Sequence, residues 1–262
     1  MKAFRLVPYA AAAALALCAS GAHATGAAFR TTLSDVHFGV IDLTPDDNVA
    51  AGYSYSFVQS SYGIELRGSD FNDHFYNSGY APVSRSVSRG SSFASLDVAA
   101  VPGMIDIGGS ADSRLDSSTR ATASAYQAFN FTLAANTVLT LDGHLFQQAN
   151  LLPAAVPDGR AESYVSIWLE GIGSDQSVRY FKSFSVTDRQ PAALNEHDFW
   201  LSYANPTDHE MTVAVRFNVN SMAKVSPVPE PSAFAMLGVG LLAVGAAARH
   251  RQTSATVQGE RA

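Results

Sequence analysis

The sequence predicts an all-β protein, an antiparallel two-layer β-sandwich of jelly-roll kind, with an N-terminal signal helix and a C-terminal transmembrane helix. Residues 25–227 alternate apolar and polar side chains with a period of two and show no long 3.6-residue periodicity. Residues 1–24 combine basic, apolar and small residues in the order of an export signal. Residues 233–248 carry no charge and form a second apolar segment. A chain of 262 residues is long enough to bury one sizeable core.

The first 24 residues have the three parts of a secretory signal peptide. Lys2 and Arg5 precede an apolar run, and Ala22 and Ala24 form an A-x-A cleavage site. The apolar run is short for a bilayer of roughly 30 Å, so we expect a signal peptidase to cleave after Ala24. The single cysteine, Cys18, leaves with this segment, which excludes a disulfide framework or a cysteine nucleophile in the mature chain.

The body, residues 25–227, shows its clearest alternation in TVAVRFNVN at 212–220, where every second residue is Val or Phe. Residues 129–145 predict two strands around a turn at 134–136, and YVSIWLE at 164–170 predicts another. The same pattern predicts further strands at Phe29–Leu33, Val36–Leu43, Tyr53–Val58, Tyr62–Leu66, Phe93–Val98, Val178–Val186 and Phe199–Tyr203. Nine or ten short strands with one apolar face each favour a two-layer antiparallel sandwich.

Two segments of the body predict loops. NLLPAAVPDGR, residues 150–160, is rich in Ala and Pro and is expected to connect strands within one domain. SRSVSRGSSFAS, residues 84–95, places Arg85 and Arg89 among six serines and predicts a mobile surface loop. A contact between these arginines and an acidic exopolysaccharide is the alternative function for this segment.

The apolar segment near the C-terminus predicts a single transmembrane helix over residues 232–248. Its uncharged stretch of sixteen residues, 233–248, would be roughly 24 Å long as a helix, a little under the hydrocarbon thickness. Pro229 and Pro231 keep the preceding residues extended, because proline cannot lie inside a helix. The basic cluster Arg249, His250 and Arg251 is expected to stay cytoplasmic, followed by a cytoplasmic tail at 252–262.

Val228, Pro229, Glu230 and Pro231, the apolar segment and the basic cluster together resemble the PEP-CTERM sorting signal of Gram-negative bacteria over residues 228–251. The resemblance implies that an exosortase, a membrane-embedded cysteine transpeptidase, removes the helix and sends the body to the cell surface or the extracellular matrix. The helix would hold the folded body at the membrane while the extended segment presents the processing site. A plain single-span anchor is the alternative, because the tail continues past the basic cluster.

The charge and motifs of the body argue against several functions. Residues 25–227 carry 12 Lys and Arg against 21 Asp and Glu, a net charge of −9, which disfavours nucleic acid as a partner. Neither G-x-S-x-G nor H-E-x-x-H occurs, and no phosphate-binding glycine loop is present, so we expect no enzymatic activity. A carboxylate pair from separated segments would support a polysaccharide-active enzyme, but such a pair cannot be recognised in a sequence.

The body contains candidate metal ligands in two kinds of segment. DLTPDDN provides Asp42, Asp46 and Asp47, oxygen ligands of the kind that calcium prefers, although Asp is also a good turn former. No other cofactor is expected. His197 and His209 lie in acidic contexts that two loops would have to bring together to form a metal site.

A possible sugar platform comes from Tyr164 and Trp168, which alternation places on the polar face of their strand. The alternative is that a loop covers both rings, because large aromatic side chains are usually buried. From the export signals at both ends of the chain, the sequence predicts a surface or matrix protein with a structural or adhesive role. The other two hypotheses are a carbohydrate-binding module, stabilised by calcium, and a membrane-anchored periplasmic protein. The expected partners are signal peptidase, an exosortase, the membrane before processing, and exopolysaccharide.

Overall fold

The computed structural model describes residues 25–79, 82–113, 118–152 and 158–226 of the chain. The predicted signal peptide at 1–24, the sorting signal at 228–251 with its helix at 232–248, and the tail at 252–262 lie outside the described residues. Ala24–Pro227 form one compact unit. Among the described residues, no helix is long and apolar enough to cross a membrane.

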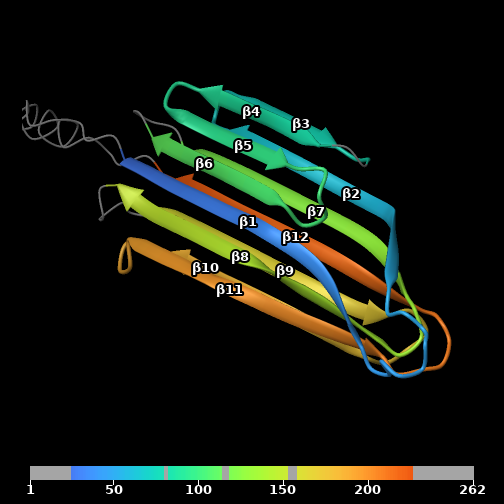
Figure 1. Cartoon of the computed structure of the whole chain (residues 1–262). Coiled ribbons are helices and arrows are strands. Elements are labelled where there is room, and N and C mark those ends of the chain that lie inside the picture. The colour runs from blue at the N-terminus through green and yellow to red at the C-terminus, as the bar shows by residue number, and fades with distance from the viewer. Residues whose placement is uncertain (1–24, 80–81, 114–117, 153–157, 227–262) are drawn as a thin grey trace, which may run out of the picture. The chain divides into compact units, whose positions relative to one another are not determined.

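The described chain forms twelve β-strands, which are joined into two antiparallel six-stranded sheets. The strands are β1 (Thr25–Asp42), β2 (Tyr53–Arg67), β3 (Asn72–Asn77), β4 (Val83–Arg89), β5 (Ser92–Val98), β6 (Ile105–Ser113), β7 (Thr119–Leu133), β8 (Thr137–Leu152), β9 (Arg160–Gly171), β10 (Ser177–Val186), β11 (Ala192–Asn205) and β12 (Met211–Val225). Sheet A has the order β11-β8-β1-β6-β5-β4 and sheet B the order β10-β9-β12-β7-β2-β3 (Figure 1). The two sheets pack face to face, so the predicted all-β sandwich is confirmed.

Two pairs of predicted strands are each one long strand with a β-bulge. In β1 the register shifts between Ser34 and His37, where Asp35 has a positive φ of 52°. In β2 it shifts between Phe57 and Gln59. A bulge inserts one extra residue, so the apolar alternation changes phase while the ladder continues. The phase change in the sequence therefore suggests that one strand ends and another begins, although in the structure a single strand continues through the bulge.

The predicted loop at 84–95 was wrong, because it contains β4, a two-residue turn and the start of β5. β4 is an edge strand. Its serines point to solvent, and its other face alternates valine with arginine, so its sequence shows no continuous apolar face. Residues 150–152 of the other predicted loop belong to β8, and β9 begins at Arg160.

The core lies between the sheets and is built from alternate residues of nearly every strand. Its largest fully buried side chains include Phe129, Phe131, Phe217 and Tyr62. Gly103 has a φ of +81° and lies against the Phe217 ring, where any side chain would collide with that ring. Its N–H donates to Gln127 Oε1 at 2.8 Å, which fixes the β5–β6 turn over the core.

Buried polar side chains also cross the interface between the sheets. Thr31 Oγ1 lies 2.7 Å from Ser163 Oγ and 2.9 Å from Ser221 Oγ. Gln147 Nε2 donates to Ser163 Oγ at 2.7 Å, and Asn195 Nδ2 donates to Gln147 Oε1 at 2.9 Å. Because buried polar groups are costly without partners, this network disfavours sliding of one sheet over the other.

Both ends of the described body lie at the same end of the sandwich. Thr25 pairs with Ser113, which precedes Thr119 by a short connection, and Thr119 pairs with Val225. Figure 1 shows the start of β1 and the end of β12 together. We call this the proximal end. The opposite, distal end holds the loops at 43–52, 134–136, 172–176 and 206–210.

Candidate functional site

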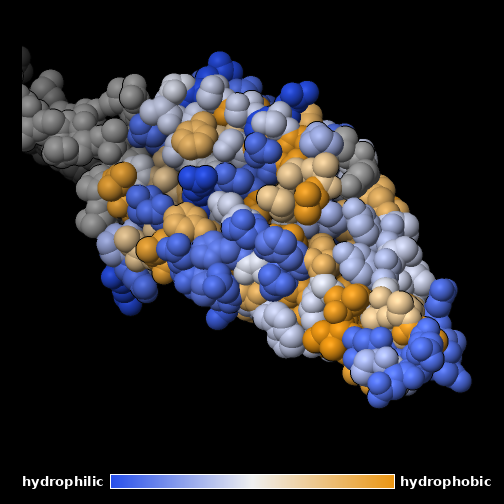
Figure 2. All heavy atoms as spheres, viewed as in Figure 1, coloured by the Kyte–Doolittle hydropathy of each residue, from blue (hydrophilic) through white to orange (hydrophobic). Residues whose placement is uncertain are grey.

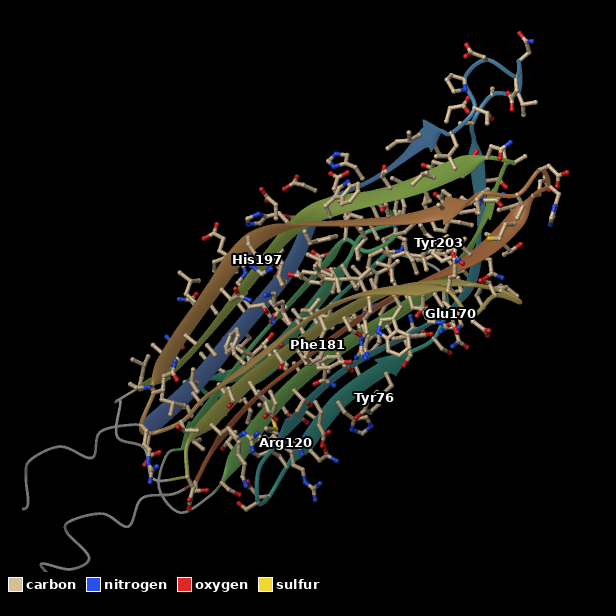
Figure 3. All side chains as sticks on the ribbon, turned by 90° about the horizontal axis from the view of Figure 1, so that it is seen from below. Tyr76, Arg120, Glu170, Phe181, His197 and Tyr203 are labelled. Carbon is tan, nitrogen blue, oxygen red and sulfur yellow. The ribbon has the colours of Figure 1, made fainter. Side chains whose placement is uncertain are left out.

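An aromatic patch lies on the outer face of sheet B. Strand alternation buries Ile167 and turns Tyr164 and Trp168 outward on β9, as predicted. The neighbouring β10 adds Arg179, whose register partner is Trp168, and Phe181. We define the aromatic patch as Tyr126, Tyr164, Trp168 and Phe181. In Figure 3, Phe181 lies in the same layer as Arg120 and Glu170 of sheet B, and His197 lies in the other layer.

Two rings of the patch contact each other, and one cation lies over two of its rings. The Arg179 guanidinium lies 4.4 Å from the centroid of the Trp168 ring and 5.2 Å from that of Phe181. Tyr164 and Phe181 meet edge to face with centroids 5.3 Å apart. These geometries are favourable for cation–π and aromatic pairs, so they hold the rings in place.

A hollow of about 140 Å³ lies beside these rings, lined by Tyr126, Tyr164, Ser166, Trp168, Arg216 and Asn218. Tyr164 Oη donates to Ser166 Oγ at 3.2 Å, and Arg216 Nη1 donates to Glu170 Oε2 at 2.5 Å. Aromatic faces beside a few fixed donors and acceptors form the kind of surface on which a sugar ring can stack and hydrogen-bond. The alternative, a loop over Tyr164 and Trp168, is not found among the described residues: both rings are half-buried, and a guanidinium covers Trp168.

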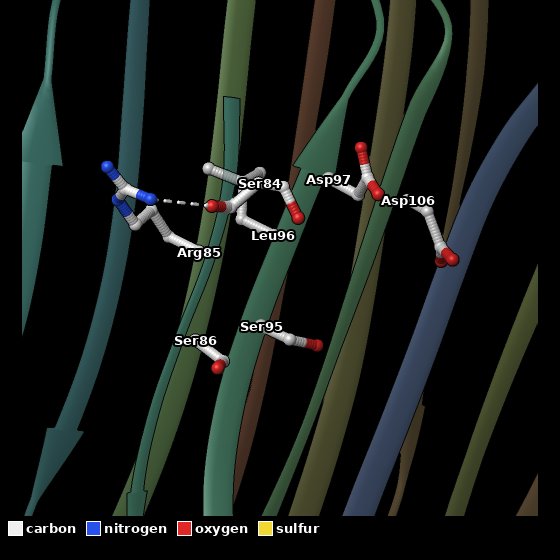
Figure 4. A pocket seen from close by; sticks show the side chains of 7 residues that line it. All are labelled: Ser84, Arg85, Ser86, Ser95, Leu96, Asp97 and Asp106. Atoms are coloured by element: carbon white, nitrogen blue, oxygen red, sulfur yellow. Dashed lines mark hydrogen bonds between the residues drawn. The ribbon is translucent and has the colours of Figure 1, made fainter. Parts of the chain in front are cut away.

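A polar trough lies on the outer face of sheet A over β4, β5 and β6, with a volume of about 510 Å³ (Figure 4). Its lining consists of Ser84, Arg85, Ser86, Ser95, Leu96, Asp97 and Asp106. Asp97 and Asp106 are direct cross-strand partners, so two carboxyl groups lie side by side in the trough. The sequence did not identify this pair, because the pairing register of β5 and β6 is not visible in their residues.

The two carboxyl groups have different surroundings. Arg30 donates to Asp106 from Nε at 3.3 Å and from Nη2 at 2.9 Å, and Thr32 Oγ1 donates at 2.8 Å. Asp97 is exposed to solvent. Glycoside hydrolysis requires one carboxyl group to stay protonated, usually in an apolar pocket. Among the described residues, Asp106 is paired with a guanidinium and Asp97 is exposed, so neither carboxyl group has such a pocket.

The histidines do not form a joint site. His197 lies within β11, where Tyr180 Oη contacts its Nε2, whereas His209 lies in the β11–β12 turn beside Asp208. Burial raises the pKa of Tyr180 to about 12. Burial, followed by the charge of Lys182, lowers the pKa of His197.

His144 points outward from β8 and contacts two acids of β11. Its Nδ1 lies 2.9 Å from Asp198 Oδ1, and its Nε2 lies 3.5 Å from Glu196 Oε1. The hydrogen bond to Asp198 is the main cause that raises the pKa of His144. This part of sheet A is therefore held by charge pairs across two strands.

The calcium candidates Asp42 and Asp47 make turn hydrogen bonds. Asp42 Oδ1 accepts from the Thr44 N–H at 2.8 Å, and Asp47 accepts from Thr44 Oγ1 at 2.6 Å and from the Val49 N–H at 2.7 Å. The bond from Thr44, followed by that from Val49, lowers the pKa of Asp47. In the described ranges, no group of three or more His, Asp or Glu is arranged to hold a metal ion. Calcium binding near Asp42, Asp46 and Asp47 stays a prediction.

An aromatic ledge at the distal half was not predicted. β4, β5 and β6 of sheet A extend only along the proximal half of the sandwich, so the inner face of β2 in sheet B is uncovered further along. Tyr53 and Tyr55 lie there 5.5 Å and 5.3 Å from the Phe131 centroid, and they are 37% and 49% exposed. Figure 2 shows hydrophobic residues toward this end of the face that it presents, including the region of the β1–β2 loop.

The sorting residues Val228, Pro229, Glu230 and Pro231 and the basic cluster Arg249, His250 and Arg251 lie outside the described residues, as do Ala22 and Ala24. A family model for the PEP-CTERM protein-sorting motif matches residues 227–252. No curated protein matches the chain. The chain therefore carries the PEP-CTERM protein-sorting motif that its sequence pattern predicted, and this motif marks an exported protein that is targeted to an exosortase.

Proposed function

We propose that the protein is a surface or extracellular-matrix protein with a structural or adhesive role and no catalytic activity. One observation carries this proposal: β12 ends at Val225, two residues before the sorting motif begins at 227. An exosortase that acts near Val228–Pro231 would remove the membrane helix without cutting any strand of the sandwich. The released product would be a complete folded domain.

The intact mass of the protein from the native host's surface and medium tests this proposal, because the mass reports both termini. We expect a form that begins at Thr25 and ends within or just after Val228–Pro231. A form that retains Ala262 and occurs only in the inner membrane would overturn the proposal. The protein would then be a membrane-anchored periplasmic protein.

We further propose carbohydrate binding by the aromatic patch as the means of adhesion. The supporting observation is the hollow beside Tyr164 and Trp168, with Asn218 and Arg216 at its border. Because Arg179 occupies one face of Trp168, a sugar must either contact the remaining ring surface or displace this side chain.

A glycan array with and without added calcium tests sugar binding. The sequence offers a matched control, because its second tryptophan, Trp200, is 63% exposed on the outer face of sheet A. We expect Trp168→Ala to abolish the signal, since stacking contacts dominate such sites, and Trp200→Ala to retain it. A blank array for the unmodified protein under both conditions would contradict this proposal, as would equal loss in both variants.

A further inference from the structure

Four basic side chains form one row across the outer face of sheet B at its proximal end. Arg67 of β2 pairs with Arg120 of β7, Arg120 pairs with Lys224 of β12, and Lys224 pairs with Arg160 of β9. All four residues are exposed. Figure 3 shows Arg120 toward the end of the sandwich at which β12 finishes. We call these four residues the basic row.

The basic row is electrostatically unfavourable for the isolated body. Like charges directly opposite each other on neighbouring strands destabilise a sheet, and the row contains three such pairs in succession. Among the described residues, only Arg160 of the row forms an ion pair, with Glu162 at 2.6 Å. Glu65 lies on the same face, one side-chain position inward from Arg67. The row therefore has an unbalanced positive charge that an external anionic surface would balance.

The charge of the distal end has the opposite sign. The four distal loops, together with the end of β1, hold Asp42, Asp46, Asp47, Asp175, Asp208 and Glu210 and no Lys or Arg. Acids also occur at the proximal end, in turns at Asp70, Asp158 and Asp188 and on strands at Asp73, which pairs with Arg89, and Asp112, but none of them lies within the row. The body is thus polarised along its strands, which gives it a preferred orientation near an anionic surface.

The chain itself limits how far the basic row can be from a membrane. Lys224 lies eight residues before Ser232, where the membrane helix of the sorting signal is predicted to begin. Eight residues span at most about 29 Å when fully extended. As long as the signal is anchored, the row is within about four Debye lengths of the lipid headgroups at physiological salt, and the flexible reach of the tether includes direct contact. The tether keeps its effective concentration at the surface high.

We propose that the basic row docks the body onto anionic lipid headgroups of the membrane before processing. This inference rests on the proposed function in one respect, namely that the body is exported and anchored by its C-terminal signal. Docking places the segment after Val225 at the membrane surface and turns the acidic distal end away from it. Removal of the helix ends the tether, and the row alone then holds the body too weakly to prevent release.

Energy transfer in vesicles tests the proposal with the full mature chain. Export removes Cys18, so a Thr122→Cys variant has one thiol for a donor dye, on the outer face of β7 one side-chain position from Arg120. A Ser174→Cys variant labels the distal end. The acceptor is a headgroup-labelled lipid, in vesicles of either phosphatidylcholine alone or phosphatidylcholine with about a third phosphatidylglycerol.

We expect the transfer efficiency from position 122 to be about twofold higher in the anionic vesicles and to fall to the zwitterionic value in roughly 0.5 M salt, because salt screens such contacts. Transfer from position 174 should not rise. Arg120→Gln combined with Lys224→Gln should abolish the difference. The matched control, Arg85→Gln with Lys182→Gln, changes the net charge equally and should retain it.

Equal transfer in both lipids would overturn the proposal, as would a difference that the control pair also abolishes. Loss of binding to an acidic polysaccharide in the row variant, without any lipid dependence, would assign the row to a matrix partner instead. A urea unfolding midpoint for each variant separates loss of docking from loss of folding. The assay contains no exosortase, so a failure of host processing would refute the proposed function and leave this result unchanged.

Discussion

On the outer face of sheet A, acidic side chains predominate, whereas on the outer face of sheet B, basic and aromatic side chains do. The strands of sheet A turn outward Asp97, Asp106, Asp112, Asp142, Glu196 and Asp198 against Arg30. Those of sheet B turn outward Arg67, Arg120, Arg160, Arg179, Arg216 and Lys224 against Glu65, Glu162 and Glu170. The inner faces of both sheets are mainly apolar, with buried polar side chains such as Gln127 and the hydrogen-bond network around Thr31 among them.

This difference separates what holds the sandwich together from what it presents to partners. Residues between the sheets all fill the same core, so the inner residues of the two sheets are chemically alike. Outer residues have no packing requirement of that kind, and their sorting by charge is therefore informative about partners. Sheet B combines the aromatic patch with the basic row, and sheet A presents hydroxyl and carboxyl groups.

The largest expected effect contrasts the two faces of a single strand, β9. Ile167 is fully buried between the sheets, and Trp168 points outward beneath Arg179. Ile167→Ala should lower the free energy of unfolding by about 2–5 kcal/mol, because it leaves a cavity in the core. Trp168→Ala should lower it by about 1 kcal/mol, through loss of the cation–π contact. Urea unfolding of the mature chain measures both, and equal losses would contradict the division between faces.

A smaller effect is expected from the acidic face. Arg30→Ala removes the cation that neutralises Asp106, which lies beside Asp97 on the next strand, and should destabilise the protein by about 0.5–1 kcal/mol, since solvent screens this exposed pair. Adding Asp106→Asn should recover most of the loss. Arg85→Ala is the control, because among the described residues Arg85 has no carboxylate partner. Failure of the double variant to recover would show that repulsion between the carboxyl groups is not the cause.

The sequence predicts the fold and the local faces well, because both depend on alternation within one strand. Val213, Val215 and Phe217 are buried as their spacing requires, and Tyr164 and Trp168 share an outer face. Strands with an interrupted apolar face are missed. β4 alternates two valines with two arginines on one face and has serines on the other, and the apolar alternation of β6 is interrupted by two adjacent glycines.

The composition of the sites depends on pairing between strands that are far apart in the chain, which the sequence does not show. Arg179 reaches Trp168 only because β10 pairs with β9 in one register. The basic row joins residues from positions 67 to 224, none of which is notable alone. Asp97 and Asp106 are only nine positions apart, but a shift of one residue would turn one of them into the core.

The smallest effect, on pH dependence, compares a histidine of the acidic face with one that faces inward. Asp198 raises the pKa of His144 above its usual value of about 6.5, so protonation favours the folded state. This contribution is fully present below that usual value and is lost as the pH rises through the folded-state pKa. Burial lowers the pKa of His197, so its contribution is present above the usual value and is lost as the pH falls through its lowered folded-state pKa.

The two histidines therefore give opposite slopes of stability against pH, and single substitutions separate them. In urea midpoints taken from about pH 5 to 8, His144→Gln should lose stability relative to the unmodified protein mainly at the acidic end. His197→Gln should remove the decline on acidification that this residue causes, so that its profile falls less steeply at low pH. If His144→Gln kept the profile of the unmodified protein, the contact with Asp198 would contribute nothing to folding, and protonation of His144 would not stabilise the acidic face.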